Sequence, residues 1–311
     1  MQQTSRVEDP EPLITPHVPH ATFSTPDINS GAGDTQGSVE ARSGWLMELG
    51  LRANEWDHME RTALHTAAGS GQAAACEALL LRQSEASAAE LNLVDAQDWQ
   101  GATPVHLAVG HGSAAVCRLL AAKRADLQAG LEFGVTPLQM AAEKGHEEVL
   151  NLLLADVVQR GGPEAILPAI VAARVSDGRG AWLLAAAEGQ LGCCKALRES
   201  LSESELGALA PDRSGRGAMV LAARGGHTEL CSWLLQSGAC PAGLAEIDSC
   251  GWTPLHAASA EGHKGTVEWL LEHNADPMVG DEEGKTAREW AELRGRAAIE
   301  SLLRKAEKAK S

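Results

Sequence analysis

The sequence predicts an all-α solenoid made of repeated pairs of short helices. The first observation is residues 253–271, TPLHAASAEGHKGTVEWLL, where two helical patterns flank a glycine. The second is that this pattern returns several times along the chain. The third is that neither helix is long enough to be stable alone in water, so each must pack against a neighbouring copy.

Each part of this stretch has a separate physical reason. Thr253 and Pro254 predict a helix start, because threonine caps a first turn and proline suits the first helical position. Gly262 predicts the end of that helix, because glycine adopts the left-handed conformation without steric cost. Apolar residues within 267–271 then recur at helical spacing and predict the second helix.

Aligning the glycines between the helices gives seven copies, 33 to 44 residues apart. Their equivalent first positions are Thr62, Thr103, Thr136, Gly180, Gly217, Thr253 and Thr286. Four copies are well kept: TALHTAAGSG, TPVHLAVGHG, TPLQMAAEKGH and TPLHAASAEGH. The copies at Gly180 and Gly217 are degenerate. The last copy carries Arg288 and Glu289 at positions that are apolar elsewhere, as expected of a terminal repeat with one solvated face.

These motifs resemble the ankyrin repeat family, whose period is about 33 residues. The resemblance covers about residues 38–305, with residues 38–49 similar to a second helix that caps the array. It implies an ankyrin-repeat solenoid that binds a protein, without naming the partner, because the fold serves many functions. Within the long insertion after the third copy, residues 164–175 predict extra helical turns interrupted by Pro168.

The ends of the chain differ from the repeats. Residues 1–37 hold five of the thirteen prolines together with many serines, threonines, glycines and acids. They show no helical or strand period, so we expect a disordered tail. Thr15-Pro16 and Thr25-Pro26 are candidate phosphorylation sites or ordinary tail dipeptides. Residues 306–311 are interpreted as a short C-terminal tail.

Composition excludes several classes of function. The 311 residues carry a formal net charge of −16, which argues against broad nucleic-acid binding and against docking on an anionic membrane. There is no apolar run of about 20 residues and no secretory signal pattern. We therefore expect an intracellular monomer, cytoplasmic or nuclear.

The cysteines and histidines recur at fixed positions of the repeat and do not cluster into one site. Cys76, Cys117, Cys194 and Cys231 share one position of the second helix, so we interpret them as small buried side chains. Packed helices lie about 8–10 Å apart, too far for disulfides between equivalent positions, and the lack of Cys-x-x-Cys argues against zinc. The ankyrin resemblance implies that His65, His106 and His256 hold their turns by hydrogen bonds to the backbone.

No catalytic motif stands out. Neither G-x-S-x-G nor a phosphate-binding G-x-x-x-x-G-K-[ST] occurs, so we expect no catalytic, cofactor or metal site. The resemblance instead implies partner binding through hairpin tips and first helices. The candidate residues are Met59, Trp99, Phe133, Arg179, Arg213, Arg216, Arg224 and Trp252.

These candidates form an apolar run over the first three repeats and an arginine run over repeats 4 and 5. The expected function is that of an adaptor, scaffold or regulatory subunit. The alternative is a recruiting or inhibitory subunit of an enzyme with a separate catalytic chain. A third class, nucleic-acid binding, would use the arginine run. Each tip aromatic also has a structural alternative, in which it folds back over its own hairpin.

Overall fold

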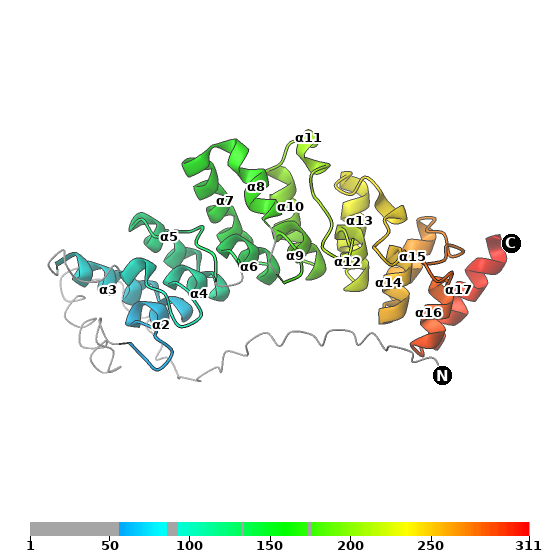
Figure 1. Cartoon of the computed structure of the whole chain (residues 1–311), viewed down its shortest axis with the longest axis horizontal. Helices are drawn as coiled ribbons and strands as arrows, with labels where there is room; N and C mark the ends of the chain where they lie inside the picture. The colour runs from blue at the N-terminus through cyan, green and yellow to red at the C-terminus, as the bar shows by residue number, and fades with distance from the viewer. Residues whose placement is uncertain (1–55, 86–92, 132–133, 173–175, 311) are drawn as a thin grey trace, which may run out of the picture.

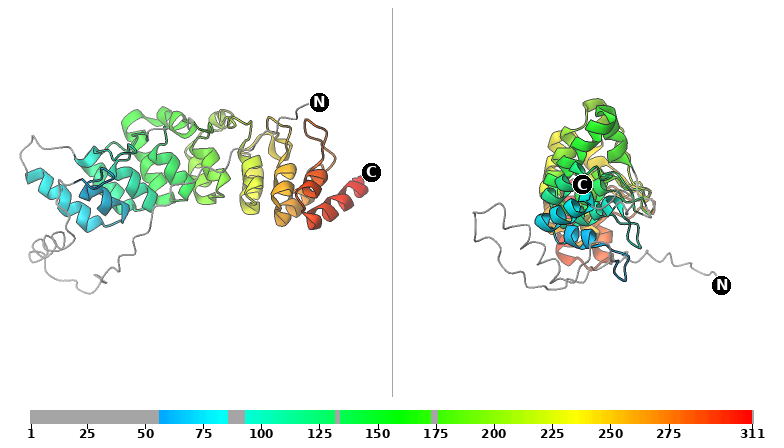
Figure 2. Two further views of the ribbon diagram at one scale, coloured as in Figure 1. Left: turned by 60° about the horizontal axis from the view of Figure 1, so that its bottom comes forward. Right: turned by 90° about the vertical axis from the view of Figure 1, so that its left-hand side faces the viewer.

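The computed structural model describes residues 56–85, 93–131, 134–172 and 176–310. These form sixteen α-helices, fourteen of which lie in two rows (Figure 1). The expected tail, residues 1–37, and the expected cap, residues 38–49, lie outside the described residues. Seen along its long axis the array is narrow, because the repeats lie one behind another (Figure 2). The predicted all-α solenoid is confirmed.

Each repeat contributes one helix to each row. The first helices are α2 (Ala63–Gly69), α4 (Pro104–His111), α6 (Pro137–Lys144), α9 (Ala181–Ala187), α12 (Ala218–Arg224), α14 (Pro254–Glu261) and α16 (Ala287–Leu293). The second helices are α3 (Ala73–Glu85), α5 (Ala114–Ala122), α7 (Glu147–Gly161), α10 (Leu191–Glu199), α13 (Thr228–Ser237), α15 (Lys264–Glu272) and α17 (Ala297–Lys310). These seven pairs are called repeats 1 to 7.

Shorter helices fill the insertions. They are η1 (Leu93–Asp95), η2 (Pro163–Ala165), α8 (Ile166–Val171), α11 (Glu203–Leu206) and η3 (Gly243–Ala245). Pro168 does not interrupt α8, because it occupies the first turn, where a missing N–H leaves no hydrogen bond unmade. The last helix, α17, continues to Lys310, so the expected division at residue 305 falls inside it.

Threonine capping boxes begin the well-kept repeats. The Thr62 N–H donates to Nδ1 of His65 over 3.1 Å, and Nε2 of His65 lies 3.0 Å from the carbonyl oxygen of Ala102 in the next repeat. His256 repeats this arrangement with Thr253 and with the carbonyl oxygen of Lys285. These histidines therefore cap their own helix and also bond to the following repeat.

The cysteines are buried as expected. Cys76, Cys117, Cys194 and Cys231 are fully buried, and all seven cysteines of the chain are free thiols. Burial raises the pKa of the Cys76 and Cys231 thiols to about 12, so these thiols stay protonated and unreactive at neutral pH.

The glycines that replace threonine in repeats 4 and 5 are required by their surroundings. A Cβ on Gly180 would lie 2.5 Å from the backbone oxygen of Ile170 in α8. A Cβ on Gly217 would overlap the carboxylate of Glu246, which reaches back from the loop before repeat 6. Glu246 Oε2 accepts a hydrogen bond from the Met219 N–H over 3.3 Å, so this carboxylate caps α12 in place of a threonine.

Restoring the repeat pattern at this position is expected to destabilise the protein. Gly217→Thr should lower the free energy of unfolding by about 1–3 kcal/mol, because the new side chain displaces the Glu246 carboxylate from the end of α12. Denaturant unfolding measures the loss. Gly265→Ala is the control, since nothing lies within 4 Å of the added Cβ and alanine favours a helix. A Gly217→Thr protein more stable than wild type would contradict this account.

Candidate functional site

The hairpins before the first helices share one internal hydrogen-bond pattern. In repeats 1, 2, 5, 6 and 7 an aspartate Oδ1 accepts from the backbone N–H groups two and four residues later, over 2.8 to 3.0 Å. These aspartates are Asp57, Asp98, Asp212, Asp248 and Asp281. Each therefore holds a rigid turn and presents the residue that follows it.

The presented residues form a row along the array, which we call the tip row. Its members are His58, Trp99, Arg213, Ser249 and Glu282, and all are exposed. Neighbouring hairpins are joined by backbone hydrogen bonds. The Trp99 N–H donates to Met59 O over 3.2 Å, and the Glu282 N–H donates to Cys250 O over 3.1 Å. The tip row is thus joined between repeats 1 and 2 and between repeats 6 and 7.

The N-terminal end of the tip row is apolar. Trp99 is 53% exposed and Trp56 is 41% exposed, while Met59 is half-buried beside them. The hydrogen bond between Trp99 and Met59 keeps the first two hairpins together. Phe133, expected to continue this patch, lies outside the described residues. The exposure of Trp99 does not favour the structural alternative, in which a tip aromatic folds back over its own hairpin.

Two of the four candidate arginines share one buried carboxylate. Arg179 Nε lies 3.2 Å from Asp212 Oδ2, and Arg216 Nη2 lies 2.9 Å from the same oxygen. The Asp212 side chain is fully buried, and both arginine side chains are about one-fifth exposed. These arginines tie the hairpins of repeats 4 and 5 together, and they are poorly placed to anchor a partner.

The other two arginines are more open. Arg224 is exposed and pairs with Glu261 over 3.3 Å. Arg213 is exposed at the tip of repeat 5, where its Nη1 lies 3.5 Å from the carbonyl oxygen of Ser176. Within the described part of the chain Arg213 has no carboxylate partner, so it contributes the free positive charge of the arginine run.

Trp252 belongs to the packing between repeats 6 and 7. It is half-buried, and its ring centroid lies 4.8 Å from that of Trp290. The Trp290 Nε1–H donates to Asp281 Oδ2 over 2.7 Å, and Lys285 Nζ lies 5.1 Å from the Trp290 ring. Trp252 therefore packs against the neighbouring repeat 7, a contact that the structural alternative, in which a tip aromatic folds back over its own hairpin, does not describe.

The sequence also contains arginine–aspartate pairs in successive repeats, which the sequence analysis did not identify. Arg61 and Arg179 each stand immediately before the first position of a repeat, and each contacts the hairpin aspartate of the next repeat. Asp98 and Asp212 are those aspartates. An arginine immediately before one repeat, followed by an aspartate in the hairpin of the next repeat, was the sequence signal that these arginines join hairpins.

No group of three or more His, Cys, Asp and Glu side chains among the described residues is placed to hold a metal ion. None of the described helices is both long and apolar enough to cross a membrane.

Comparison with known proteins gives the family. A profile described as ankyrin repeats matches in three copies, over residues 85–161, 182–281 and 242–310.

The chain is 30% identical over 141 residues to human transient receptor potential cation channel subfamily A member 1, covering 45% of this chain and 11% of that protein. It is 36% identical over 107 residues to zygote-specific protein 3 of Chlamydomonas reinhardtii, covering 34% and 26%. It is 38% identical over 102 residues to ankyrin repeat protein nuc-2 of Neurospora crassa, covering 32% and 9%. The chain therefore matches only about a tenth to a quarter of the length of these relatives.

Proposed function

Because the chain belongs to the ankyrin repeat family, we propose that it is a non-catalytic binding subunit, an adaptor, scaffold or regulatory protein, that holds a partner protein on its tip row. Ankyrin repeats are generally protein–protein interaction modules, and the family is generally non-catalytic. The observation that carries the proposal is the 53% exposed Trp99 indole on a rigid hairpin. Buried aromatic anchors supply most of the energy of protein interfaces, and packing gives no reason to expose this one.

Charge supports a second, weaker contribution from the middle of the tip row. Arg213 is exposed and free of described carboxylates, so it attracts an acidic region of the partner. Such a rim charge acts mainly on the association rate and its salt dependence. Trp99 and Trp56 then supply the contact area that slows dissociation.

Position-dependent photo-crosslinking tests the proposal and identifies the partner in the same experiment. A photoreactive amino acid at position 99 or 213 of the full chain is expected to capture the same protein. Glu272 provides the control position, because it is exposed at the end of the second helix α15. Equal capture from Glu272, or capture of nothing from position 99, would contradict a partner on the tip row.

Trp99→Ala is expected to weaken binding of the captured partner by about 2 kcal/mol or more. The melting temperature should stay nearly unchanged, because Trp99 is largely exposed and its hairpin is held by Asp98. Calorimetry and thermal melting measure the two effects. Trp252→Ala is the matched control: it removes a tryptophan packed on Trp290 and should lower the melting temperature. A Trp99→Ala protein that melts much earlier and binds normally would show that Trp99 is a packing residue.

A further inference from the structure

A groove lies between second helices α5 and α7, away from the hairpin tips. It has a volume of about 420 Å³, is open to solvent, and is lined by Ala121, Arg124, Asp156, Gln159 and Arg160. A second hollow of about 230 Å³ shares three of these residues and adds Arg118, Leu127, Leu152 and Ala155. The groove exists because α7 has fifteen residues and α5 only nine, so the last turns of α7 extend past the end of α5 (Figure 1).

Arg124 is held in a conformation that glycine would adopt more easily. Its φ is +63°, one of three positive values among the described non-glycine residues. The equivalent positions in repeats 5 and 6 hold Gly238 and Asn274, which tolerate this conformation. Such strain often marks a functional site, where a side chain is kept against the preference of the backbone.

No side-chain interaction of Arg124 within the described residues offsets this strain. Its side chain is exposed, and its guanidinium makes no hydrogen bond or ion pair with any other residue that the structure describes. Arg160 is different: its Nε lies 2.9 Å from Asp156, and its Nη2 donates to the carbonyl oxygen of Ala125 over 3.0 Å. Arg160 therefore builds the wall of the groove, and Arg124 is left free at its rim.

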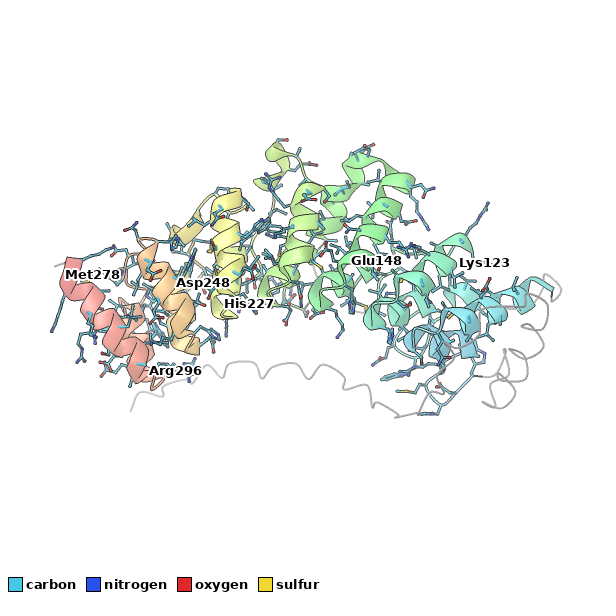
Figure 3. The ribbon with its side chains drawn as sticks, turned by 180° about the vertical axis from the view of Figure 1, so that it is seen from behind. Lys123, Glu148, His227, Asp248, Met278 and Arg296 are labelled. Atoms are coloured by element: carbon cyan, nitrogen blue, oxygen red, sulfur yellow. The ribbon has the colours of Figure 1, made fainter. Side chains whose placement is uncertain are left out.

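The charge and floor of the groove indicate what it fits. Arg118, Arg124 and Arg160 line it, with Lys123 beside them at the end of α5, against Asp156 and the Glu148 partner of Arg118 (Figure 3). This basic excess stands out in a chain of net charge −16. The half-buried Leu152 supplies an apolar surface beside these charges. Arginine binds carboxylates with two parallel hydrogen bonds, which suits an acidic ligand.

We propose that this groove is a second docking surface, and that it binds an acidic segment of a partner protein. A carboxylate of that segment pairs with Arg124, and a neighbouring apolar side chain covers the half-buried Leu152. The surface lies on the row of second helices, so the proposal does not rest on the tip row. It lets the chain hold two proteins at once, one on each face.

Peptide display on the full-length protein tests the proposal. A library of random 12-residue peptides is selected on wild-type protein, with Arg124→Gly as the counter-selection. The enriched peptides are expected to be acidic and to carry an apolar residue. Arg124→Gly should weaken their binding, measured by fluorescence anisotropy, by at least about tenfold. Enriched peptides without an acidic preference, or equal binding to both proteins, would overturn the proposal.

The variant also separates binding from folding. Arg124→Gly is expected to leave the melting temperature unchanged or higher, because glycine adopts a φ of +63° without strain. Asn274→Gly makes the same kind of change at the equivalent position of repeat 6 and should leave peptide binding intact. Trp99→Ala should also leave it intact, which keeps the two surfaces distinct. If a peptide of residues 1–20 of this chain displaces the selected peptides, the acidic segment belongs to the chain itself. The proposal that a partner protein fills the groove would then be wrong.

Discussion

Asp212→Ala is expected to lower the free energy of unfolding by about 3–5 kcal/mol, because it removes one partner from a buried ionic cluster. The fully buried carboxylate is shared by Arg179 and Arg216, and its other oxygen accepts from the Ser214 and Arg216 N–H groups. Without it, the Arg216 guanidinium loses its counter-charge, and Arg179 keeps only the longer pair with Asp177, over 3.7 Å.

Denaturant unfolding measures the total loss, and hydrogen exchange locates it in repeats 4 and 5. Asp212→Asn is expected to lose less, because its amide oxygen still accepts from the backbone. Glu148→Ala removes the exposed Arg118 pair and should cost less than about 1 kcal/mol. An Asp212→Ala protein within about 1 kcal/mol of wild type would show that the cluster contributes little to the fold.

Acid is expected to weaken the array through its buried histidines. Burial lowers the pKa of His65 and His256, and it lowers the pKa of His106 from 6.5 to about 4. In this range the unfolded chain binds more protons than the folded one, so stability is present above pH 6.5 and is lost as pH falls. One unit of pKa corresponds to about 1.4 kcal/mol, so His106 alone accounts for roughly 3 kcal/mol between pH 6.5 and pH 4.

The repeats contain a natural replacement for this residue. In repeat 3 Gln139 takes the histidine position: its Oε1 accepts from the Thr136 N–H over 3.1 Å, and its Nε2 donates to Ala172 O. His106→Gln should therefore keep the capping box and lose less stability on acidification. Urea unfolding of both proteins at pH 7 and pH 4 measures the difference, in which other titrating groups cancel. Equal acid losses in the two proteins would mean that His106 does not titrate on unfolding.

The sequence predicted those parts of the fold that each repeat determines locally. Threonine, proline and glycine at fixed positions gave the helix starts and ends, and Cys76 and its equivalents were correctly placed in the core. The insertion that forms η2 and α8 was also predicted, with a wrong role for Pro168. These features depend on residues close together in the chain.

The candidate site was less predictable because its contacts join different repeats. Arg179 was expected to face a partner, but the stacking of repeat 5 on repeat 4 brings the Asp212 carboxylate to it. Trp252 likewise meets Trp290 only when repeat 7 is in place. Whether a polar tip residue is free depends on these long-range contacts. The tip prediction for Trp99 needed no such contact, and its exposure agrees with the sequence.

The carboxylate of Glu246 has a consequence for how this chain can evolve and be engineered. A repeat array lengthens by copying a unit that can sit beside any other unit. Repeat 5 is not such a unit, because the cap of its first helix comes from the segment before repeat 6. A duplicate of repeat 5 inserted elsewhere would lack that cap, and truncation after residue 238 would remove it. We therefore expect repeats 5 and 6 to keep their stability only when they are moved or deleted together.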